Sequence, residues 1–204
     1  MMTRVFAAWL ALFLLGGSLG CGSPRMAPPP KSAAMLPAEP SSPGTSDQAI
    51  LKEGLTGRTL SASEVADLSD RLLADGSNTF NDQESMARLE LLILKTMKSP
   101  DKTSVAVLWR SLGIIHYHQK KYKQAEHDLQ SANELNPKNP RTHYYLACLF
   151  AHQGQIYANK GKKRISSQQF KRAAIEMELA RKLAPNNALY KQDPKQLIQQ
   201  ENGK

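Results

Sequence analysis

The stretch between Trp109 and Pro137 constrains the fold of this chain more than any other. It holds apolar and small residues at spacings that fit two successive helices: Trp109, Leu112, Gly113, Ala125, Leu129, Ala132 and Pro137. Gly113 has no side chain, so two helices can approach closely there, and Ala125 and Ala132 share a helical face on which a neighbour can pack. Pro137 stops the second helix. The pattern predicts a helical hairpin.

This pattern resembles the tetratricopeptide repeat, a 34-residue hairpin with the signature W-x2-L-G-x2-Y, A-x3-F, Ala and Pro. The spacing is kept throughout residues 104–139, where Leu129 replaces the aromatic residue and His116 replaces the tyrosine. The resemblance implies an all-α fold, a short solenoid of stacked helical hairpins. In such a solenoid the first helix of each hairpin lines a concave inner face.

A second copy of the pattern follows in residues 140–187. Its first helix is expected around Tyr144–Phe150 and its second around Phe170–Ala180, and a proline closes it. These two helices lie further apart in the sequence than the helices of the first copy. The additional residues are enough to lengthen each helix by about two turns. We therefore predict an elongated hairpin with helices near 141–160 and 166–183. A loop insertion is the alternative.

Helices are also expected on both sides of the two copies. In residues 47–103, Ser61 and Glu64 form a capping-box pattern, and an apolar stripe at helical spacing follows Asp82. This part is predicted to be a degenerate hairpin that packs on the others, because two repeats are fewer than the three usually needed for stability. Residues 188–204 are expected to form a capping helix and tail that shield the last hairpin.

The N-terminus has the pattern of an export signal. Arg4 precedes the apolar run Val5–Leu15, and small residues then lead to Cys21. Residues 1–20 are therefore a predicted signal peptide. The cysteine after it resembles that of bacterial lipoproteins, which implies cleavage before Cys21, a diacylglycerol on its thiol and an acylated amino terminus. In the usual lipobox, leucine lies three residues before the cysteine and a small residue lies two before it. Here Ser18 and Leu19 hold these two positions in the reverse order. The alternatives are a secreted protein without lipid and an uncleaved anchor.

Residues 21–46 are rich in proline and have no apolar period. Such a composition predicts an extended, disordered tether, which beside an acyl anchor would hold a folded domain away from a membrane. Cys148 is the one other cysteine, so an intramolecular disulfide is impossible if Cys21 is lipidated. We expect a buried, inert thiol at Cys148, and the alternative is intermolecular pairing.

The formal net charge of +9 is concentrated in the C-terminal half of the chain. Many of the basic residues fall at the predicted turns of the two hairpins, which should share one edge of the stack: Lys120, Lys121, Lys123, Lys160, Lys162, Lys163 and Arg164. The favoured interpretation is a solvated edge, and the alternative is a surface for anionic lipid headgroups. Export disfavours a nucleic-acid partner.

The resemblance also places a candidate partner-binding groove on the inner face. By helical spacing, six side chains should line it: Arg110, Ile114, Tyr117, Arg141, Tyr144 and Cys148. Arginine and tyrosine can hold a peptide through carboxylate contacts and stacking. The alternative is a solvated groove without a ligand. The family's clamp for C-terminal carboxylates requires an asparagine where this chain has Ile114, so that particular specificity is not expected.

The sequence has no pattern for catalysis or metal binding. Its five histidines lack the spacing of metal ligands, and no serine lies in a nucleophile motif. A glycine-rich phosphate loop is also missing from the sequence. We therefore expect no enzymatic activity, no metal and no cofactor beyond the acyl groups on Cys21.

Together these features predict a membrane-anchored adaptor of the bacterial cell envelope. It would bind an extended or helical segment of another envelope protein. The chain resembles the small repeat lipoproteins that help to assemble pili, secretion pores or peptidoglycan machinery. Gly22 lacks the acidic side chain that retains lipoproteins in the inner membrane of enteric bacteria, which favours the periplasmic side of the outer membrane. The alternative is a self-associating structural module, which predicts an apolar C-terminal face.

Overall fold

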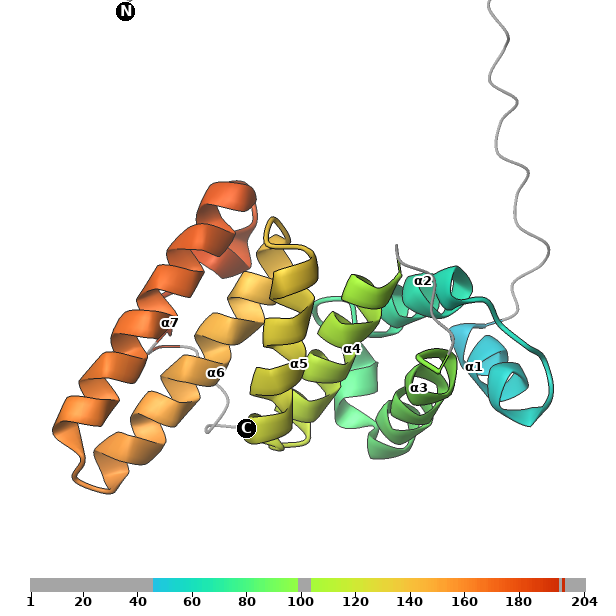
Figure 1. Cartoon of the computed structure of the whole chain (residues 1–204), viewed down its shortest axis with the longest axis horizontal. Coiled ribbons are helices and arrows are strands. Elements are labelled where there is room, and N and C mark those ends of the chain that lie inside the picture. The colour runs from blue at the N-terminus through green and yellow to red at the C-terminus, as the bar shows by residue number, and fades with distance from the viewer. Residues whose placement is uncertain (1–45, 99–103, 195, 197–204) are drawn as a thin grey trace, which may run out of the picture. The chain divides into compact units, whose positions relative to one another are not determined.

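The computed structural model describes residues 46–98, 104–194 and 196, and every regular element among them is a helix (Figure 1). This confirms the predicted all-α class. The predicted signal peptide, Cys21 and the tether lie outside the described residues, as does most of the predicted capping helix. In the part of the chain that the structure describes, no helix combines the length and the apolar character needed to cross a membrane.

Four elements form the N-terminal part: α1 (Asp47–Thr56), α2 (Ala62–Leu72), the 3-10 helix η1 (Asn78–Asn81) and α3 (Gln83–Thr96). The capping box expected at the start of α2 is present. The backbone N–H of Glu64 donates to Ser61 Oγ, and the Glu64 carboxylate accepts from the Ser61 backbone N–H at 2.8 Å. Asp82 caps α3 by accepting from the backbone N–H groups of Glu84 and Ser85. These side chains satisfy N–H groups that have no partner inside the helix.

Two antiparallel hairpins follow: α4 (Val105–His118) with α5 (Tyr122–Leu135), and α6 (Pro140–Asn159) with α7 (Lys163–Leu183). α4 and α5 have 14 residues each, whereas α6 has 20 and α7 has 21. The additional residues of the second copy therefore lengthen both helices and do not form a loop. The second hairpin lies beside the first, and α6 packs against both α4 and α5 (Figure 1).

The two helices of the first hairpin approach closely at Gly113. A Cβ atom added there would lie 2.6 Å from Cγ of Leu129 and 3.1 Å from its backbone nitrogen. No larger residue fits at this position unless the helices move apart. Ala125 and Ala132 face the same interface and are buried. In the second hairpin Ala147 occupies the position of the glycine and is also buried, so small residues set the helix separation in both copies.

The N-terminal part packs against the first hairpin and continues its core. α2 and α3 both contact α4, and α1 packs mainly on α3. α2 and α3 contact each other much less than the paired helices of either hairpin do, so they form a splayed pair. Buried leucines join these helices to α4 in one apolar cluster: Leu51, Leu68, Leu72, Leu73, Leu89, Leu92 and Leu108. The two hairpins therefore gain the additional packing partner that the sequence requires.

After α7 the chain turns back along the second hairpin. Asn187 caps the 3-10 helix η2 (Ala188–Lys191) by accepting from the Leu189 backbone N–H at 3.0 Å. Tyr190 of η2 is buried, and the centre of its ring lies 5.3 Å from that of Tyr144 in α6. The chain after α7 is thus attached to the first turns of α6.

Candidate functional site

The six residues expected to line an inner groove lie on one face, but that face is covered. Arg110, Ile114 and Tyr117 come from α4 and are 6%, 0% and 5% exposed. The other three come from α6 and are buried or partly buried: Arg141, Tyr144 and Cys148. These six residues are therefore largely enclosed by other parts of the chain.

The end of α2 and the residues after it cover this face through charged contacts. Nη2 of Arg110 donates to the Asp70 carboxylate, and Nη1 of Arg141 lies 3.6 Å from the same carboxylate. Arg141 also donates to the Leu73 carbonyl and lies 3.8 Å from Asp75. A buried guanidinium needs such partners, because an unpaired charge in the interior is strongly destabilising. Sequence reasoning missed these acids, because they lie far from the arginines in the sequence.

Aromatic rings from η1 and η2 complete the cover. Phe80 of η1 stacks on His118 with 4.0 Å between the ring centres, and Tyr190 of η2 packs on Tyr144. Burial, with the Arg141 charge nearby, lowers the pKa of His118 to about 4, so its imidazole is neutral at pH 7. Burial also raises the pKa of Tyr144 above its ordinary value. The inner face is therefore protein interior, and a partner-binding role for its six residues stays a prediction.

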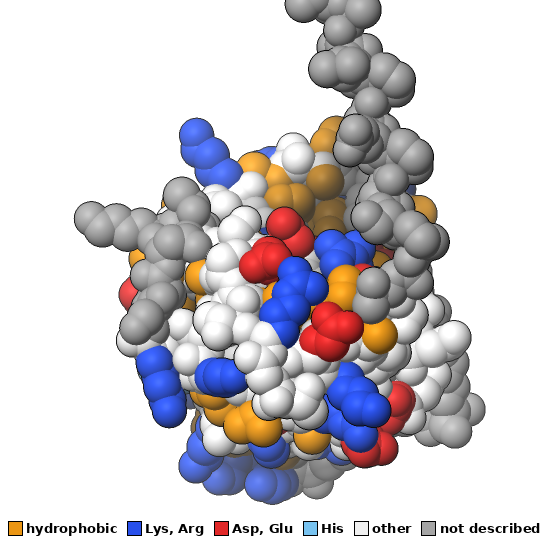
Figure 2. All heavy atoms as spheres, turned by 90° about the vertical axis from the view of Figure 1, so that its right-hand side faces the viewer, with side chains coloured by type: hydrophobic (Ala, Val, Ile, Leu, Met, Phe, Trp, Pro, Cys, Tyr) orange, Lys and Arg blue, Asp and Glu red, His pale blue; other side chains and the backbone are white. Residues whose placement is uncertain are grey.

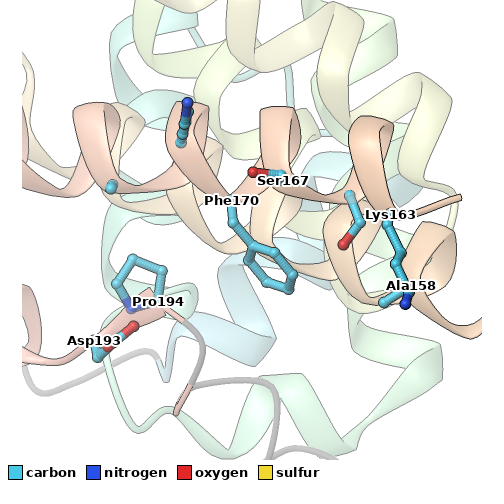
Figure 3. Close-up of a pocket in the computed structure, with 9 residues that line it drawn as sticks. Ala158, Lys163, Ser167, Phe170, Asp193 and Pro194 are labelled. Carbon is cyan, nitrogen blue, oxygen red and sulfur yellow. The ribbon is translucent and has the colours of Figure 1, made fainter.

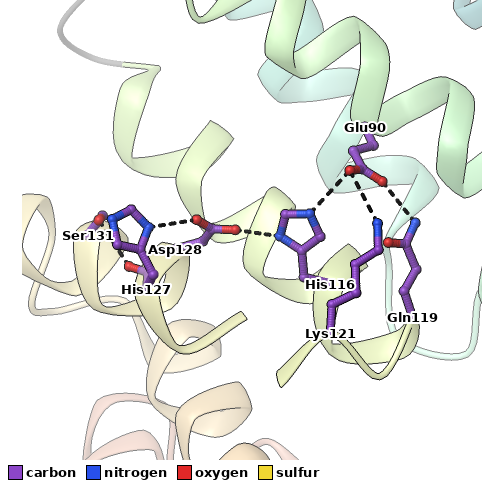
Figure 4. Close-up of polar contacts among 7 residues, drawn as sticks. All are labelled: Glu90, His116, Gln119, Lys121, His127, Asp128 and Ser131. Atoms are coloured by element: carbon purple, nitrogen blue, oxygen red, sulfur yellow. Dashed lines mark hydrogen bonds and ion pairs between the residues drawn. The ribbon is translucent and has the colours of Figure 1, made fainter. Parts of the chain in front are cut away.

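A polar network joins α3, α4 and α5 around His116 (Figure 4). Nδ1 of His116 lies 2.6 Å from Asp128, and Nε2 lies 3.2 Å from Glu90. Burial alone would lower the pKa of His116, but the hydrogen bonds to two carboxylates outweigh it and hold the pKa above its ordinary value. Gln119 and Lys121 also reach Glu90, at 2.9 and 3.6 Å. This network links three helices by placing one imidazole between two carboxylates.

Histidines of the second hairpin also have structural partners. His143 Nδ1 lies 2.7 Å from Glu176, and its Nε2 donates to the Pro137 carbonyl at 2.8 Å. The hydrogen bond to Glu176 outweighs burial and raises the pKa of His143. His152 Nε2 lies 2.7 Å from the Tyr122 hydroxyl. Across the described residues, no group of three or more His, Cys, Asp or Glu side chains could hold a metal ion.

The basic residues of the predicted edge lie at the ends of both hairpins. The α4–α5 turn and the α6–α7 turn are on the same side of the stack (Figure 1). At the first turn, Lys121 is partly neutralised by Glu90. At the second turn four basic residues are exposed: Lys160, Lys162, Lys163 and Arg164. From His152 to Ile175 the sequence has no aspartate or glutamate, so the longer hairpin ends in a segment that is charged with one sign, named here the basic tip.

The end of the helix row formed by α1, α2 and α3 has a different charge pattern. Acidic and basic side chains alternate on this end (Figure 2). Arg58 lies 3.5 Å from Glu53 and 3.0 Å from Glu64, and Arg71 lies 2.9 Å from Asp47. Each exposed pair contributes little to stability, but opposite charges cancel locally. The positive potential therefore belongs to the second hairpin.

A pocket of about 600 Å³ lies beside α7 near the basic tip (Figure 3). It is named here the α7 pocket, and its lining includes Ala158, Lys163, Phe170, Lys171, Ala174 and Pro194. The Phe170 ring projects into the space between Pro194 and Ala158. Gly154 permits this ring position, because a Cβ atom added there would lie 3.2 Å from the ring. Sequence reasoning found Lys163 but missed the pocket.

A row of exposed apolar side chains follows another face of α7. Ile175, Leu179 and Leu183 are spaced four residues apart and are 61%, 37% and 39% exposed. They form the α7 outer row. Two of the corresponding positions on α5 hold the polar residues His127 and Ser131, so the full row occurs on α7 and not on α5. An apolar surface of this kind is what the self-association hypothesis predicts for the C-terminal end.

The fold and these surfaces define a short stack of helical hairpins. Residues 106–139 match the family model of the tetratricopeptide repeat. That range covers α4, α5 and the connection to α6, so the comparison confirms that the first hairpin is a tetratricopeptide repeat. No curated protein and no solved structure matches the chain. Repeats of this family suggest a protein-binding scaffold and generally lack catalytic activity.

Proposed function

We propose that this protein is an adaptor that holds another protein at a membrane of the bacterial cell envelope. The tetratricopeptide repeat supports the binding role, because stacked hairpins present extended surfaces to other proteins. The observation that carries the proposal is the second hairpin, which is longer than the first and carries a basic tip and a row of exposed apolar side chains on α7. Because the six residues of the expected groove are enclosed by the chain itself, the second hairpin is the surface that we propose for the partner.

The membrane attachment rests on the lipoprotein-like sequence that ends at Cys21. Acyl groups on this cysteine would anchor the chain, and the proline-rich tether would let the helical stack stand away from the membrane. Gly22 supports the periplasmic side of the outer membrane. The partner would be another envelope protein, for example a component of pilus, secretion or peptidoglycan assembly. Anionic lipid headgroups are a second contact for the basic edge.

Metabolic labelling with a fatty-acid analogue tests the anchor. Wild-type chain should incorporate the label and remain with membranes, and Cys21→Ala should lose both properties. Cys148→Ala is the matched control, because it removes the other thiol and should retain the label. Labelling that persists in Cys21→Ala would exclude this anchor.

Crosslinked affinity capture tests the adaptor role. The full-length chain, crosslinked in membranes and then extracted in detergent, should recover the same envelope protein repeatedly. Reciprocal capture from that protein should return the chain. Recovery of the chain alone, with no second protein in either direction, would contradict an adaptor.

The α7 outer row favours one alternative function, a self-associating envelope module. Exposed apolar patches commonly mark protein contacts, and a second copy could cover this row. If so, the mass measured by light scattering should rise with concentration, and Ile175→Glu with Leu179→Glu should keep the chain monomeric. A wild-type chain that is monomeric at all accessible concentrations would exclude the alternative and leave the adaptor proposal intact.

A further inference from the structure

Both hairpin turns carry lysine at a position where a helix commonly begins with a capping side chain. Lys121 is the N-cap of α5 and Lys162 is the N-cap of α7, and neither side chain caps its helix. By contrast, α1, α2, α3 and α6 each begin with a serine, aspartate or asparagine that accepts from a backbone N–H. A lysine ammonium only donates, so it cannot satisfy the free N–H groups at a helix start. Both turns therefore lack a contact that four other helices have.

The first turns of the same two helices also carry the unfavourable sign of charge. The positive end of a helix macrodipole lies at the N-terminus, where anions stabilise the helix and cations destabilise it. α7 begins with Lys163 and Arg164, and Lys123 is the second residue of α5. Neither helix has an acidic residue in its first turn, whereas α1, α2 and α3 each have one there. The basic residues of these two turns thus oppose the stability of the helices that they start.

Lys120 shows the same placement of positive charge against local stability. Its φ of 62° lies in the left-handed region, which glycine adopts without strain. Gly161, with a φ of 70°, holds the equivalent position in the second turn, because the backbone N–H of each residue donates to the third residue before it, Tyr117 or Ala158. Local rules that are broken repeatedly in one place are typical of a functional surface. Solvation alone does not explain this edge.

Acidic side chains do not balance the charge of the basic edge, which consists of the seven basic residues of the two turns. Lys121 lies 3.6 Å from Glu90, and among the described residues no carboxylate lies within ion-pair distance of the other six. All seven side chains are exposed. The segments outside the described residues contain six basic residues and three acidic ones, Glu39, Asp101 and Glu201. They bring a net positive charge and cannot neutralise the edge.

The form of this charge indicates what the basic edge meets. Six of the seven residues are lysines, whose ammonium groups are mobile point charges without the fixed fork by which arginine holds one carboxylate or phosphate. The turns project from two hairpins on one side of the stack (Figure 1), and Lys and Arg side chains gather at the same lower edge in Figure 2. Mobile charges along a projecting edge match a broad anionic surface better than a single acidic group. Anionic lipid headgroups attract clusters of this kind.

We propose that the basic edge docks on an anionic phospholipid bilayer, so that the stack stands on its hairpin turns and the α5–α6 connection points away from the membrane. The predicted tether, residues 21–46, would span about 30 Å as a flexible chain. An anchor at Cys21 would therefore keep the edge within reach of the headgroups and make individually weak charge contacts effective. This inference rests on the proposed membrane attachment and specifies how the stack is oriented there.

Energy transfer from the stack to the bilayer tests this orientation in the full-length chain, reconstituted into vesicles. In a Cys148→Ala background, a donor dye is attached at the tip through Asn159→Cys or at the opposite end of the second hairpin through Asn186→Cys. The acceptor dye is on lipid headgroups, and the vesicles contain phosphatidylcholine with or without phosphatidylglycerol. Transfer from Asn159→Cys should rise with phosphatidylglycerol and fall again in about 1 M salt, which screens charges beyond about 3 Å. Transfer from Asn186→Cys should not rise.

Matched charge reversals separate the basic edge from general attraction. The edge variant reverses three lysines of the second turn: Lys160→Glu, Lys162→Glu and Lys163→Glu. The control variant reverses three lysines at the other end of the second hairpin: Lys138→Glu, Lys182→Glu and Lys191→Glu. All six positions are exposed, so both variants should fold normally. The edge variant should lower the ratio of docked to undocked chain at least roughly tenfold, and the control variant should change it less than about twofold.

Several results would overturn the inference. These are equal transfer on neutral and anionic vesicles, an equal loss in the edge and control variants, and a rise at Asn186→Cys in place of Asn159→Cys. The alternative occupant is an acidic protein, and azidophenylalanine at Asn159 in intact membranes decides between the two. Crosslinks to phospholipid support docking on the bilayer, whereas crosslinks to a protein without any to lipid would overturn it.

The same experiments keep this inference apart from the proposed function. If wild type captures a partner but the edge does not dock, the adaptor role stands and the inference is wrong. If the edge docks and no partner is captured, the adaptor role fails and the inference stands. If the chain does not remain on neutral vesicles, the anchor fails, and docking is read from the amount bound to anionic vesicles. The edge variant should then bind at least roughly tenfold more weakly than the control variant.

Discussion

The two hairpins share one packing scheme but have different surroundings. The first hairpin lies between the N-terminal helices and α6, and its polar side chains are used within the chain, with His116 between Asp128 and Glu90. Among the described residues, the second hairpin packs on the first hairpin and on η2, extends further, and carries the α7 pocket and the basic tip. In the first hairpin the polar side chains serve contacts within the chain, whereas in the second hairpin several basic side chains are exposed.

The largest difference in stability between the two hairpins should appear when a histidine in each is replaced. His116→Ala leaves two carboxylates, one of them buried, without their shared partner, and removing one member of a buried charged pair costs about 3–5 kcal/mol. His143→Ala leaves the Glu176 carboxylate and the Pro137 carbonyl without their histidine partner. The expected loss of unfolding free energy is about 1–3 kcal/mol. Urea unfolding of both variants measures this. Equal losses would contradict this difference between the two hairpins.

Glycine substitutions should give a smaller difference in the same direction. Gly113→Ala places a methyl group against Leu129, including its backbone, and should destabilise by about 1–3 kcal/mol. In Gly154→Ala the nearest atoms to the new methyl group belong to the Phe170 ring, a side chain that can shift, and alanine is the better helix former by about 1 kcal/mol. Its net effect should be near zero. Thermal unfolding compares the two, and a severe loss for Gly154→Ala would show that the second hairpin is as tightly enclosed as the first.

The pH dependence of stability should separate two histidines within the first hairpin. The pKa of His116 is raised by folding, so its contribution is complete below pH 6.5 and is lost as pH rises through the folded pKa. The pKa of His118 is lowered to about 4, so its contribution is present above pH 6.5 and is lost as pH falls towards 4. His116→Gln should therefore flatten the alkaline side of the curve, and His118→Gln the acidic side. Denaturant unfolding of both variants between pH 4 and 9 measures these effects. If His116→Gln changed the acidic side and His118→Gln the alkaline side, the described network would be wrong.

The smallest effect is expected at the lysines of the pocket. Lys163→Ala and Lys171→Ala change exposed side chains and should alter stability by no more than about 0.5 kcal/mol. Lys121→Ala, at the turn of the first hairpin, loses its contact with Glu90 and should cost about as little or slightly more. Calorimetric unfolding would detect a larger loss at Lys163 or Lys171, which would indicate a structural role.

Local patterns in the sequence were sufficient to predict both hairpins. Gly113 and the alanines report contacts between neighbouring helices, and the longer separation in the second copy predicts the length of α6 and α7. The cover of the inner face could not be predicted in this way. It depends on Asp70, which is 40 residues away from Arg110 in the sequence, and no spacing rule links them. The six groove residues were therefore expected to be exposed, whereas the fold buries or partly buries them.

The α7 pocket was missed for a different reason. A repeat signature describes the helices of each hairpin, whereas this pocket is formed by one face of α7 together with Asp193 and Pro194, which lie outside the signature. Phe170 and Ala174 looked like ordinary members of the second helix in the sequence.

Site-specific photo-crosslinking in intact membranes tests the central claim most directly. Azidophenylalanine is placed at Ile175 in the α7 outer row or at Tyr144 on the covered inner face, and the crosslinked peptides are identified by mass spectrometry. The account predicts a peptide of another envelope protein at Ile175, and only contacts within the chain at Tyr144. A partner crosslinked from Tyr144 and none from Ile175 would contradict it, because the inner face would then be the surface open to a partner.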